Sequence, residues 1–191
     1  MTSLQEIVQH RRTIRKFTQE DISTAELISL MEVAVYAPNH KEREPWSFTL
    51  IRDGAKDTLY QEIVKSYERL DILSGLEKEV VEKKQEQLKK LILDPAMHLI
   101  VTMEQSEQEK VWEEDFAATS AFIQNLQLLA WEQGIGMVWK TNPYIKDPEF
   151  LRAMNINESK KIVGILHIGR PYKIPKAKPR TSVSEKLDIF E

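Results

Sequence analysis

The sequence predicts an α+β domain in which helices cover one central sheet. Three apolar segments, 48–51, 97–103 and 162–168, are typical of buried strands, and 137–140 is a shorter strand. Segments with helical spacing separate them, without a strict strand–helix–strand alternation. This pattern favours a mixed or antiparallel sheet flanked by helices.

Length and charge narrow the class of protein. The 191 residues suit one domain, and 27 basic against 30 acidic residues give a formal net charge of −3. We therefore expect neither nucleic acid nor a membrane surface as a partner. The chain has no cysteine, which excludes disulfides and cysteine-ligated metals and favours a cytoplasmic location. We expect no membrane span and no signal peptide, because no segment has the required apolar pattern.

Helix-start signals organise the N-terminal part of the chain. The pairs Ser3-x-x-Glu6 and Ser23-x-x-Glu26 are capping boxes, and each predicts that a helix begins there. Pro38 is expected to end the second helix, because proline disfavours the α conformation in the residue before it.

Two longer helical regions follow. Residues 55–93 are strongly charged with a break expected near 74–75, and their alternating charges indicate a solvent-exposed helix face. Residues 112–133 form a helix that is apolar on nearly all sides, which predicts burial at the domain centre or in a subunit interface. Asp147 followed by Pro148 predicts a small helix that runs to Met154.

The side chains offer no obvious catalytic or metal centre of their own. Gly134-x-Gly136 lacks the third glycine and the preceding strand of a dinucleotide-binding loop. His98 and His167 lie inside apolar strands, where core histidines are expected, and no pair of histidines has metal-binding spacing. An enzyme with this sequence would therefore rely on a cofactor.

A basic motif near the N-terminus is the first positive signal. Arg11, Arg12 and Arg15 surround the hydroxyl group of Thr13 within five residues. Guanidinium groups bind phosphate in a bidentate manner, so this motif suits an oxyanion. The alternatives are a solvated basic turn or a weak nucleic-acid patch, and the acidic balance of the chain argues against the latter.

A polar loop at 37–48 is the second signal. It lies between a helix and a strand and contains two prolines, so it can present hydrogen-bonding groups rigidly. Asn39 and His40 offer donors and acceptors that the pyrimidine edge of a flavin could use. The alternative is a plain connection in which Pro45 and Trp46 simply pack.

Together these motifs resemble the FMN-dependent nitroreductase family. The double signature is R-R-(S/T)-x-R at 11–15 and A-P-(S/N)-x-x-x-x-x-P-W-x-F at 37–48. Two further elements are Gln133 to Lys140 after the apolar helix, and Ile168 to Pro171 followed by Lys178-Pro179-Arg180. The resemblance implies a nitroreductase-like fold: one FMN-binding domain over residues 1–191, with 55–93 as a charged lid-like region.

The resemblance also implies tightly bound FMN at the interface of an intertwined homodimer. The FMN phosphate and ribityl chain would contact Arg11, Arg12, Thr13 and Lys178 or Arg180. Arg15 would lie near the flavin N1 and C2 carbonyl, where a positive charge favours the reduced flavin. The remaining contacts would come from Val138, Trp139 and Lys140 of the same subunit and from Tyr36, Pro38, Asn39 and His40 of the other.

The implied reaction is a ping-pong one. NADPH or NADH would reduce the flavin, and a small-molecule electron acceptor such as a nitroaromatic or quinone would then be reduced; no side chain is assigned as a general acid or base. Other flavin reactions stay open, namely dehalogenation, azoline oxidation and flavin breakdown. A flavin-binding protein with little turnover, or a helical interaction domain with a basic arm, are further alternatives. Glu42 and Glu44 depart from the family loop, which leaves the contacts of 41–44 open.

Overall fold

A four-stranded antiparallel sheet forms the centre of the protein, in the order β1-β2-β4-β3. The structure is a computed structural model that describes residues 3–191. The strands are β1 (Trp46–Arg52), β2 (Met97–Glu104), β3 (Gly136–Lys140) and β4 (Lys160–Gly169). Each overlaps a strand expected from the apolar segments, and the predicted α+β class is confirmed.

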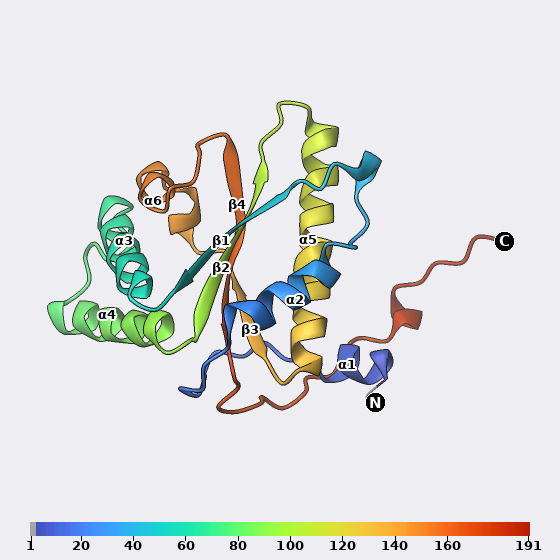
Figure 1. Cartoon of the computed structure of the whole chain (residues 1–191), viewed down its shortest axis with the longest axis horizontal. Coiled ribbons are helices and arrows are strands. Elements are labelled where there is room, and N and C mark those ends of the chain that lie inside the picture. Colours follow the sequence, from blue (N-terminus) through green and yellow to red (C-terminus); the bar gives the residue numbers. More distant parts are fainter. Residues whose placement is uncertain (1–2) are drawn as a thin grey trace.

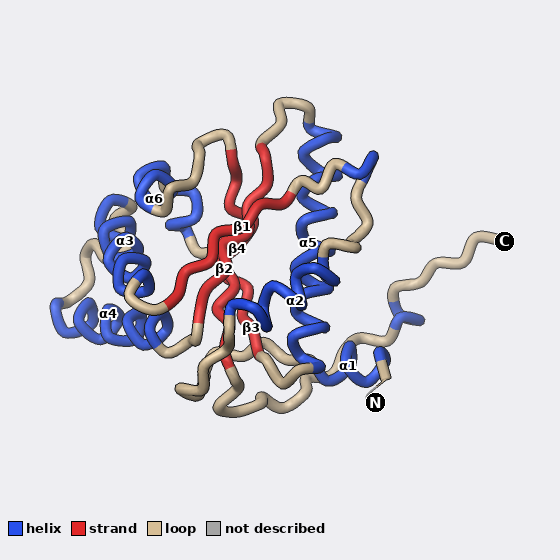
Figure 2. The backbone as a smooth tube through the Cα atoms, viewed as in Figure 1, coloured by secondary structure: helices blue, strands red, loops and turns tan. Residues whose placement is uncertain are grey.

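Helices cover both faces of this sheet (Figures 1 and 2). α3, α4 and α6 lie on one side, whereas α2 and α5 lie on the other. The α-helices are α1 (Leu4–His10), α2 (Thr24–Ala34), α3 (Ala55–Arg69), α4 (Lys78–Leu93), α5 (Glu109–Glu132) and α6 (Pro148–Ala153). Short 3-10 helices are η1 (His40–Glu42), η2 (Pro143–Lys146) and η3 (Val183–Glu185). No helix in the described part of the chain is long and apolar enough to cross a membrane.

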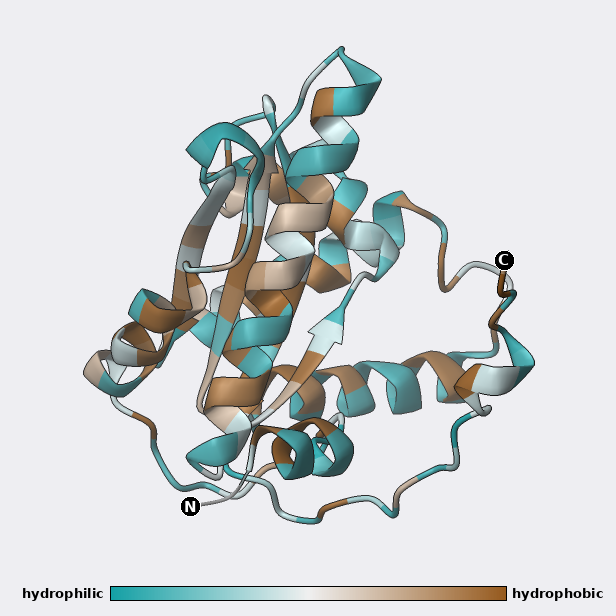
Figure 3. Ribbon diagram, turned by 90° about the vertical axis from the view of Figure 1, so that its right-hand side faces the viewer, coloured by the Kyte–Doolittle hydropathy of each residue, from teal (hydrophilic) through white to brown (hydrophobic). Residues whose placement is uncertain are grey.

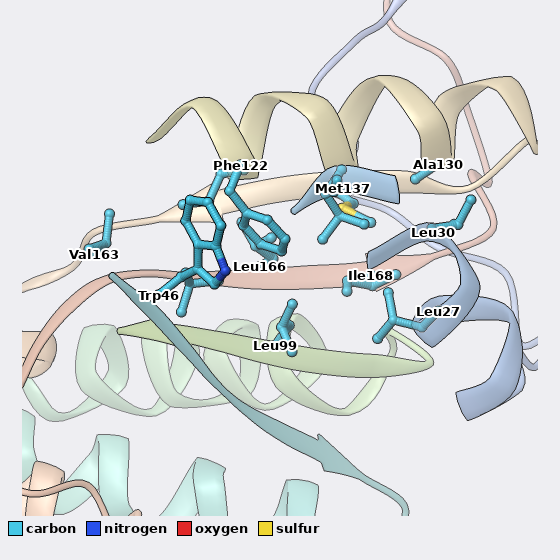
Figure 4. Packing of buried hydrophobic residues seen from close by; sticks show 14 of the residues in the cluster. Leu27, Leu30, Trp46, Leu99, Phe122, Ala130, Met137, Val163, Leu166 and Ile168 are labelled. Atoms are coloured by element: carbon cyan, nitrogen blue, oxygen red, sulfur yellow. The ribbon is translucent and has the colours of Figure 1, made fainter. Parts of the chain in front are cut away.

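The core has two parts because side chains of a strand alternate between the faces of the sheet. On the α5 side, Phe122 of α5 stacks against Trp46 of β1, with ring centroids 5.6 Å apart (Figure 4). On the other side, Ile100 and Ile165 pack against apolar residues of α3, α4 and α6. The strands at the centre are accordingly the most hydrophobic ribbon in Figure 3.

The helix signals are confirmed with two corrections. Ser3 and Glu6 form both hydrogen bonds of a capping box. Ser23 caps α2, but the carboxylate of Glu26 accepts a hydrogen bond from Arg170, so this capping box is half formed. α2 ends at Ala34, earlier than Pro38 requires, and a turn fills the gap.

His98 and His167 lie directly opposite each other on β2 and β4. Both are fully buried, so the expectation of core histidines is confirmed. The ring nitrogen Nε2 of His98 lies 2.8 Å from the carbonyl oxygen of Ile92, and Nδ1 of His167 lies 3.2 Å from that of Leu91. The pair therefore caps carbonyl groups at the C-terminal end of α4 and fixes that end to the sheet.

Candidate functional site

A basic cavity of about 260 Å³ brings together the N-terminal and C-terminal motifs. Arg15 lies at its edge and also lines a second hollow of about 420 Å³, beside Gln87 and Leu91 of α4. The basic cavity has no carboxylate in its lining, so its charge is wholly positive and favours an anion. Its lining residues are Arg11, Arg12, Thr13, Arg15, Pro175, Lys176, Lys178 and Arg180.

Arg11 is half-buried and is held to α5. One of its Nη atoms donates to Oε1 of Gln127 at 2.9 Å, whereas its buried Nε has no partner within the described chain. Burial lowers the pKa of Arg11, and the positive charges of Arg12 and Arg180 lower it further. An anion in the cavity would relieve the repulsion among these cations.

Two glycines on neighbouring strands position the basic segment. Gly136 and Gly169 are register partners on β3 and β4. A Cβ atom at Gly136 would lie 2.5 Å from Cγ1 of Ile14, and one at Gly169 would lie 2.7 Å from Cδ1 of Phe17. The missing side chains thus form a notch that holds Ile14 and Phe17, so Gly136 serves packing.

β3 divides its predicted site residues between two faces. Val138 packs with Ile14, and Lys140 lies close enough to Arg15 for the two charges to interact. Burial lowers the pKa of Lys140, and the charge of Arg15 lowers it further. The indole of Trp139 instead lies on the α5 side, over Gly164, and donates to the carbonyl of Val163 at 3.1 Å.

β3 is also an edge strand. The carbonyl of Met137 accepts a hydrogen bond from the N–H of Ile14 at 3.0 Å, outside the sheet. Because backbone groups alternate along a strand, Trp139 turns its N–H and C=O to the same outer edge. The indole of Trp139 points away from Lys140, but its backbone is available beside Arg15 and Lys140.

The loop residues predicted to contact a flavin lie elsewhere in the chain. Arg43 anchors the loop to α5 by a bidentate ion pair with Asp115, at 2.8 and 2.9 Å. Arg11 anchors the basic cavity to the same helix at Gln127. At a rise of about 1.5 Å per residue, these anchor points are roughly 18 Å apart along α5. Figure 1 shows η1 near one end of α5 and α1 near the other.

Tyr36, Pro38, Asn39 and His40 therefore do not line the basic cavity of their own chain. Tyr36 is 87% exposed, and Pro38 and His40 are also exposed. Asn39 bonds within the loop, where its Oδ1 accepts from the N–H of Glu44 at 3.0 Å. Lys41, Glu42 and Glu44 have positive φ angles of 53°, 53° and 44°, which side chains rarely adopt. The loop is thus a strained, exposed surface feature.

The sequence did not reveal the anchors of this arrangement. Asp115 and Gln127 are both buried polar residues within the apolar helix α5. A carboxylate or amide in an otherwise apolar helix is a signal that a partner exists, because an unpaired buried polar group is costly. That signal does not identify Arg43 or Arg11 as the partner.

Comparisons with known proteins agree with this geometry. The family model described as Nitroreductase family matches residues 8–170. The chain belongs to the nitroreductase family. YfhC of Bacillus subtilis, a protein named for NAD(P)H nitroreductase activity, is 35% identical over 184 residues, covering 96% of this chain and 92% of YfhC. The expected class of enzyme, an oxidoreductase of the nitroreductase type, is thereby confirmed.

Solved structures confirm the nitroreductase-like fold. A nitroreductase-like family protein from Bacillus cereus has a TM-score of 0.89 at 36% identity, covering 100% of this chain and 97% of its own. Iodotyrosine deiodinase bound to FMN and 3-iodo-L-tyrosine has a TM-score of 0.75 at 24% identity, covering 98% and 100%, and this likeness shows the fold alone. An iodotyrosine deiodinase from Thermotoga neapolitana is 25% identical over 197 residues and covers 100% of both chains.

Proposed function

We propose that this protein is a cytoplasmic FMN-dependent oxidoreductase that uses NADPH or NADH to reduce nitroaromatics, quinones or similar acceptors. The observation that carries the proposal is the wholly basic cavity, which adjoins a larger hollow at Arg15. Family membership supplies the reaction class, and the relatives named above as nitroreductases support it.

The residues of the basic cavity fit the phosphate of FMN. Arg11 and Arg12 offer guanidinium donors, Thr13 offers a hydroxyl group, and Lys178 and Arg180 close the cavity from the C-terminal segment. Bound FMN would supply the two-electron chemistry that the side chains lack.

The chain's own contribution is to bind, tune and orient. Arg15 places positive charge where the two hollows meet, and Lys140 lies near Arg15, so a negative charge is favoured there. Trp139 offers backbone hydrogen-bonding groups at the same edge of β3. These groups fix a ligand on a rigid strand, so its reactive face has one orientation. No general acid or base is assigned.

We also propose that the working form is a homodimer with the flavin at the subunit interface. The loop at 38–44 and the basic cavity lie near opposite ends of α5. If α5 of two copies pack antiparallel, the loop of one subunit approaches the cavity of the other. Apolar side chains exposed around this region support such packing: Leu4, Val8, Val33 and Tyr36 near the helices, and Leu187, Ile189 and Phe190 in the C-terminal segment.

The absorbance spectrum of the purified protein tests the cofactor. We expect flavin bands that bleach on anaerobic addition of NADPH or NADH and return when an acceptor is added. A colourless protein that does not take up added FMN contradicts the proposal. Bound flavin without bleaching by either nucleotide would instead identify a flavin-binding protein with little turnover.

Complementation tests the shared site. Arg12→Ala disables the basic cavity, and Asn39→Ala disables the loop, so each homodimer should lose activity. A refolded mixture forms mixed dimers with one intact site, and statistical mixing restores about a quarter of the activity. A mixture that stays inactive, although mixed dimers form, contradicts a site built from two subunits.

Reductive dehalogenation is the second candidate. The deiodinase relative covers the whole of this chain, which favours testing it. Release of iodide from 3-iodotyrosine under reducing conditions, at a rate comparable with the reduction of quinones, would favour this activity over the first.

A further inference from the structure

An apolar cavity of about 430 Å³ lies between α3 and α4, in addition to the basic cavity and the hollow beside Arg15. Its volume is within the range of about 300–1,000 Å³ that is typical of small-molecule sites. Apolar side chains of α3, α4 and the turn between them form most of its wall. They are Val64, Ile72, Leu73, Leu88 and Leu91.

This cavity adjoins the hollow next to Arg15. Gln87 and Leu91 of α4 line both spaces, so the two spaces meet at these side chains. The C-terminal end of α4, which follows them, is held to the sheet by His98 and His167. Lys56 adds to the same cap, because its Nζ donates to the carbonyls of Leu93 and Pro95 at 2.9 Å each. The place where the two spaces meet thus lies on a fixed element.

The lining of the cavity carries a positive charge and no negative charge. Lys84 is the charged side chain in the lining, and it lies exposed at the rim. Gln85, Gln87 and Asn142 are neutral amides, and the hydroxyl of Tyr67 accepts a hydrogen bond from Nδ2 of Asn142 at 3.4 Å. The lining contains no carboxylate, so a buried ammonium group would find no negative charge to neutralise it there.

We propose that this cavity is an acceptor-binding subsite for flat aromatic molecules that carry no positive charge, and that it excludes amino-acid zwitterions. Its role in turnover rests on the proposed function, whereas binding to it does not. The walls suit an aromatic ring, and the amides and Lys84 can bond a neutral or anionic oxygen. The zwitterion of an iodotyrosine would have to desolvate its ammonium group without a carboxylate to pair it.

Three probes with one aromatic body test the charge selectivity. Calorimetric titration of the FMN-loaded protein with 2-naphthol, 2-naphthoate and 2-naphthylmethylammonium compares a neutral, an anionic and a cationic ligand. We expect the first two to bind with dissociation constants at least tenfold below that of the cation. Equal or tighter binding of the cation overturns the proposal.

Two variants assign the binding to the cavity. Val64→Phe fills part of the space, and we expect it to raise the dissociation constants of naphthol and naphthoate about tenfold. Lys84→Glu reverses the rim charge on an exposed position, so it should weaken naphthoate severalfold while naphthol binds as before. Lys83→Glu, the same charge reversal at an exposed position of α4 outside the lining, is the matched control. Unchanged affinities in both Val64→Phe and Lys84→Glu place the probes elsewhere and overturn the proposal.

The probe titrations and the flavin absorbance test can fail independently of each other. If NADPH bleaches the flavin but no probe binds, the proposed function stands and the subsite is refuted. If the protein takes up no FMN, the same titrations on the purified chain still decide the subsite, because the residues assigned to FMN do not line it.

Discussion

The rings of His98 and His167 meet edge to face in the core, with centroids 4.4 Å apart and planes at 87°. One nitrogen of each ring donates a hydrogen bond to a carbonyl oxygen of α4, so that nitrogen carries the proton. The other nitrogen of each ring is buried and has no partner in the described chain. Both rings must therefore stay neutral for the pair to remain in place.

We predict that stability falls on mild acidification. Burial lowers the pKa of His98 from 6.5 to about 4, opposed by its bond to Ile92 and aided by Lys56. Burial, His98 and Lys140 lower the pKa of His167 well below its usual value. Between the folded and unfolded pKa values the unfolded chain binds more protons, so stability present above pH 6.5 is lost as the pH falls towards 4. The loss for His98 alone reaches about 3 kcal/mol.

Urea unfolding at several values between pH 7 and pH 4.5 measures this effect. Carboxylates also titrate near the lower limit, so the informative quantity is the difference from His98→Gln, whose amide can still donate to Ile92 but does not titrate. We expect a flatter pH dependence in that variant. Parallel curves for the two proteins would contradict the role of His98.

The glycine notch gives a second prediction. Gly136→Ala places a methyl group against Ile14, and such overpacking costs about 1–3 kcal/mol. It should also raise the dissociation constant of FMN, because Ile14 carries Thr13 and Arg15 with it. Gly54→Ala is the matched control, since a Cβ there meets nothing within 4 Å. In a double-mutant cycle with Ile14→Ala, the double variant should lose less stability in chemical denaturation than the sum of the two single variants, and additive losses would argue against a direct clash.

The ion pair between Arg43 and Asp115 gives a third prediction. Arg43→Ala leaves the buried carboxylate of Asp115 without its partner and frees the strained loop from α5. We expect weaker FMN binding and faster proteolysis within 38–45. Arg43→Lys should restore the loop in part, because lysine keeps the charge and loses the bidentate geometry. Proteolysis at the wild-type rate in Arg43→Ala would show that the loop is held by other contacts.

The central strands β2 and β4 were predictable because each is a nearly continuous apolar run, and burial on both faces of a sheet requires such runs. The pairing of residues across the sheet could not be predicted, because the register depends on all strands at once. His98 and His167 illustrate the difference: their burial follows from the surrounding residues, but their contact follows from the order β2-β4.

The candidate site divides in the same way. The basic motif at 11–15 could be predicted from the chemistry of its residues, and the structure joins it to Lys178 and Arg180 in one cavity. The notch under Ile14 could not be predicted, because Gly136 alone does not reveal which side chain fills the space that its missing Cβ leaves. Nor did the sequence indicate that the loop at 38–44 would lie at the far end of α5.

The last prediction separates phosphate binding from binding of the flavin ring. Arg12→Ala should raise the dissociation constant of FMN about tenfold to a hundredfold, because a hydrogen bond to a charged group contributes about 1.5–3 kcal/mol. Riboflavin lacks the phosphate, so its affinity should be the same in Arg12→Ala and in the wild type. Fluorescence titration of both flavins measures the two effects in one format. The FMN dissociation constant of Arg12→Lys should lie between those of the wild type and Arg12→Ala, because lysine keeps the charge but lacks the planar guanidinium group. An equal loss for FMN and riboflavin would mean that Arg12 supports the fold of the site, and the basic cavity would then not be the phosphate site.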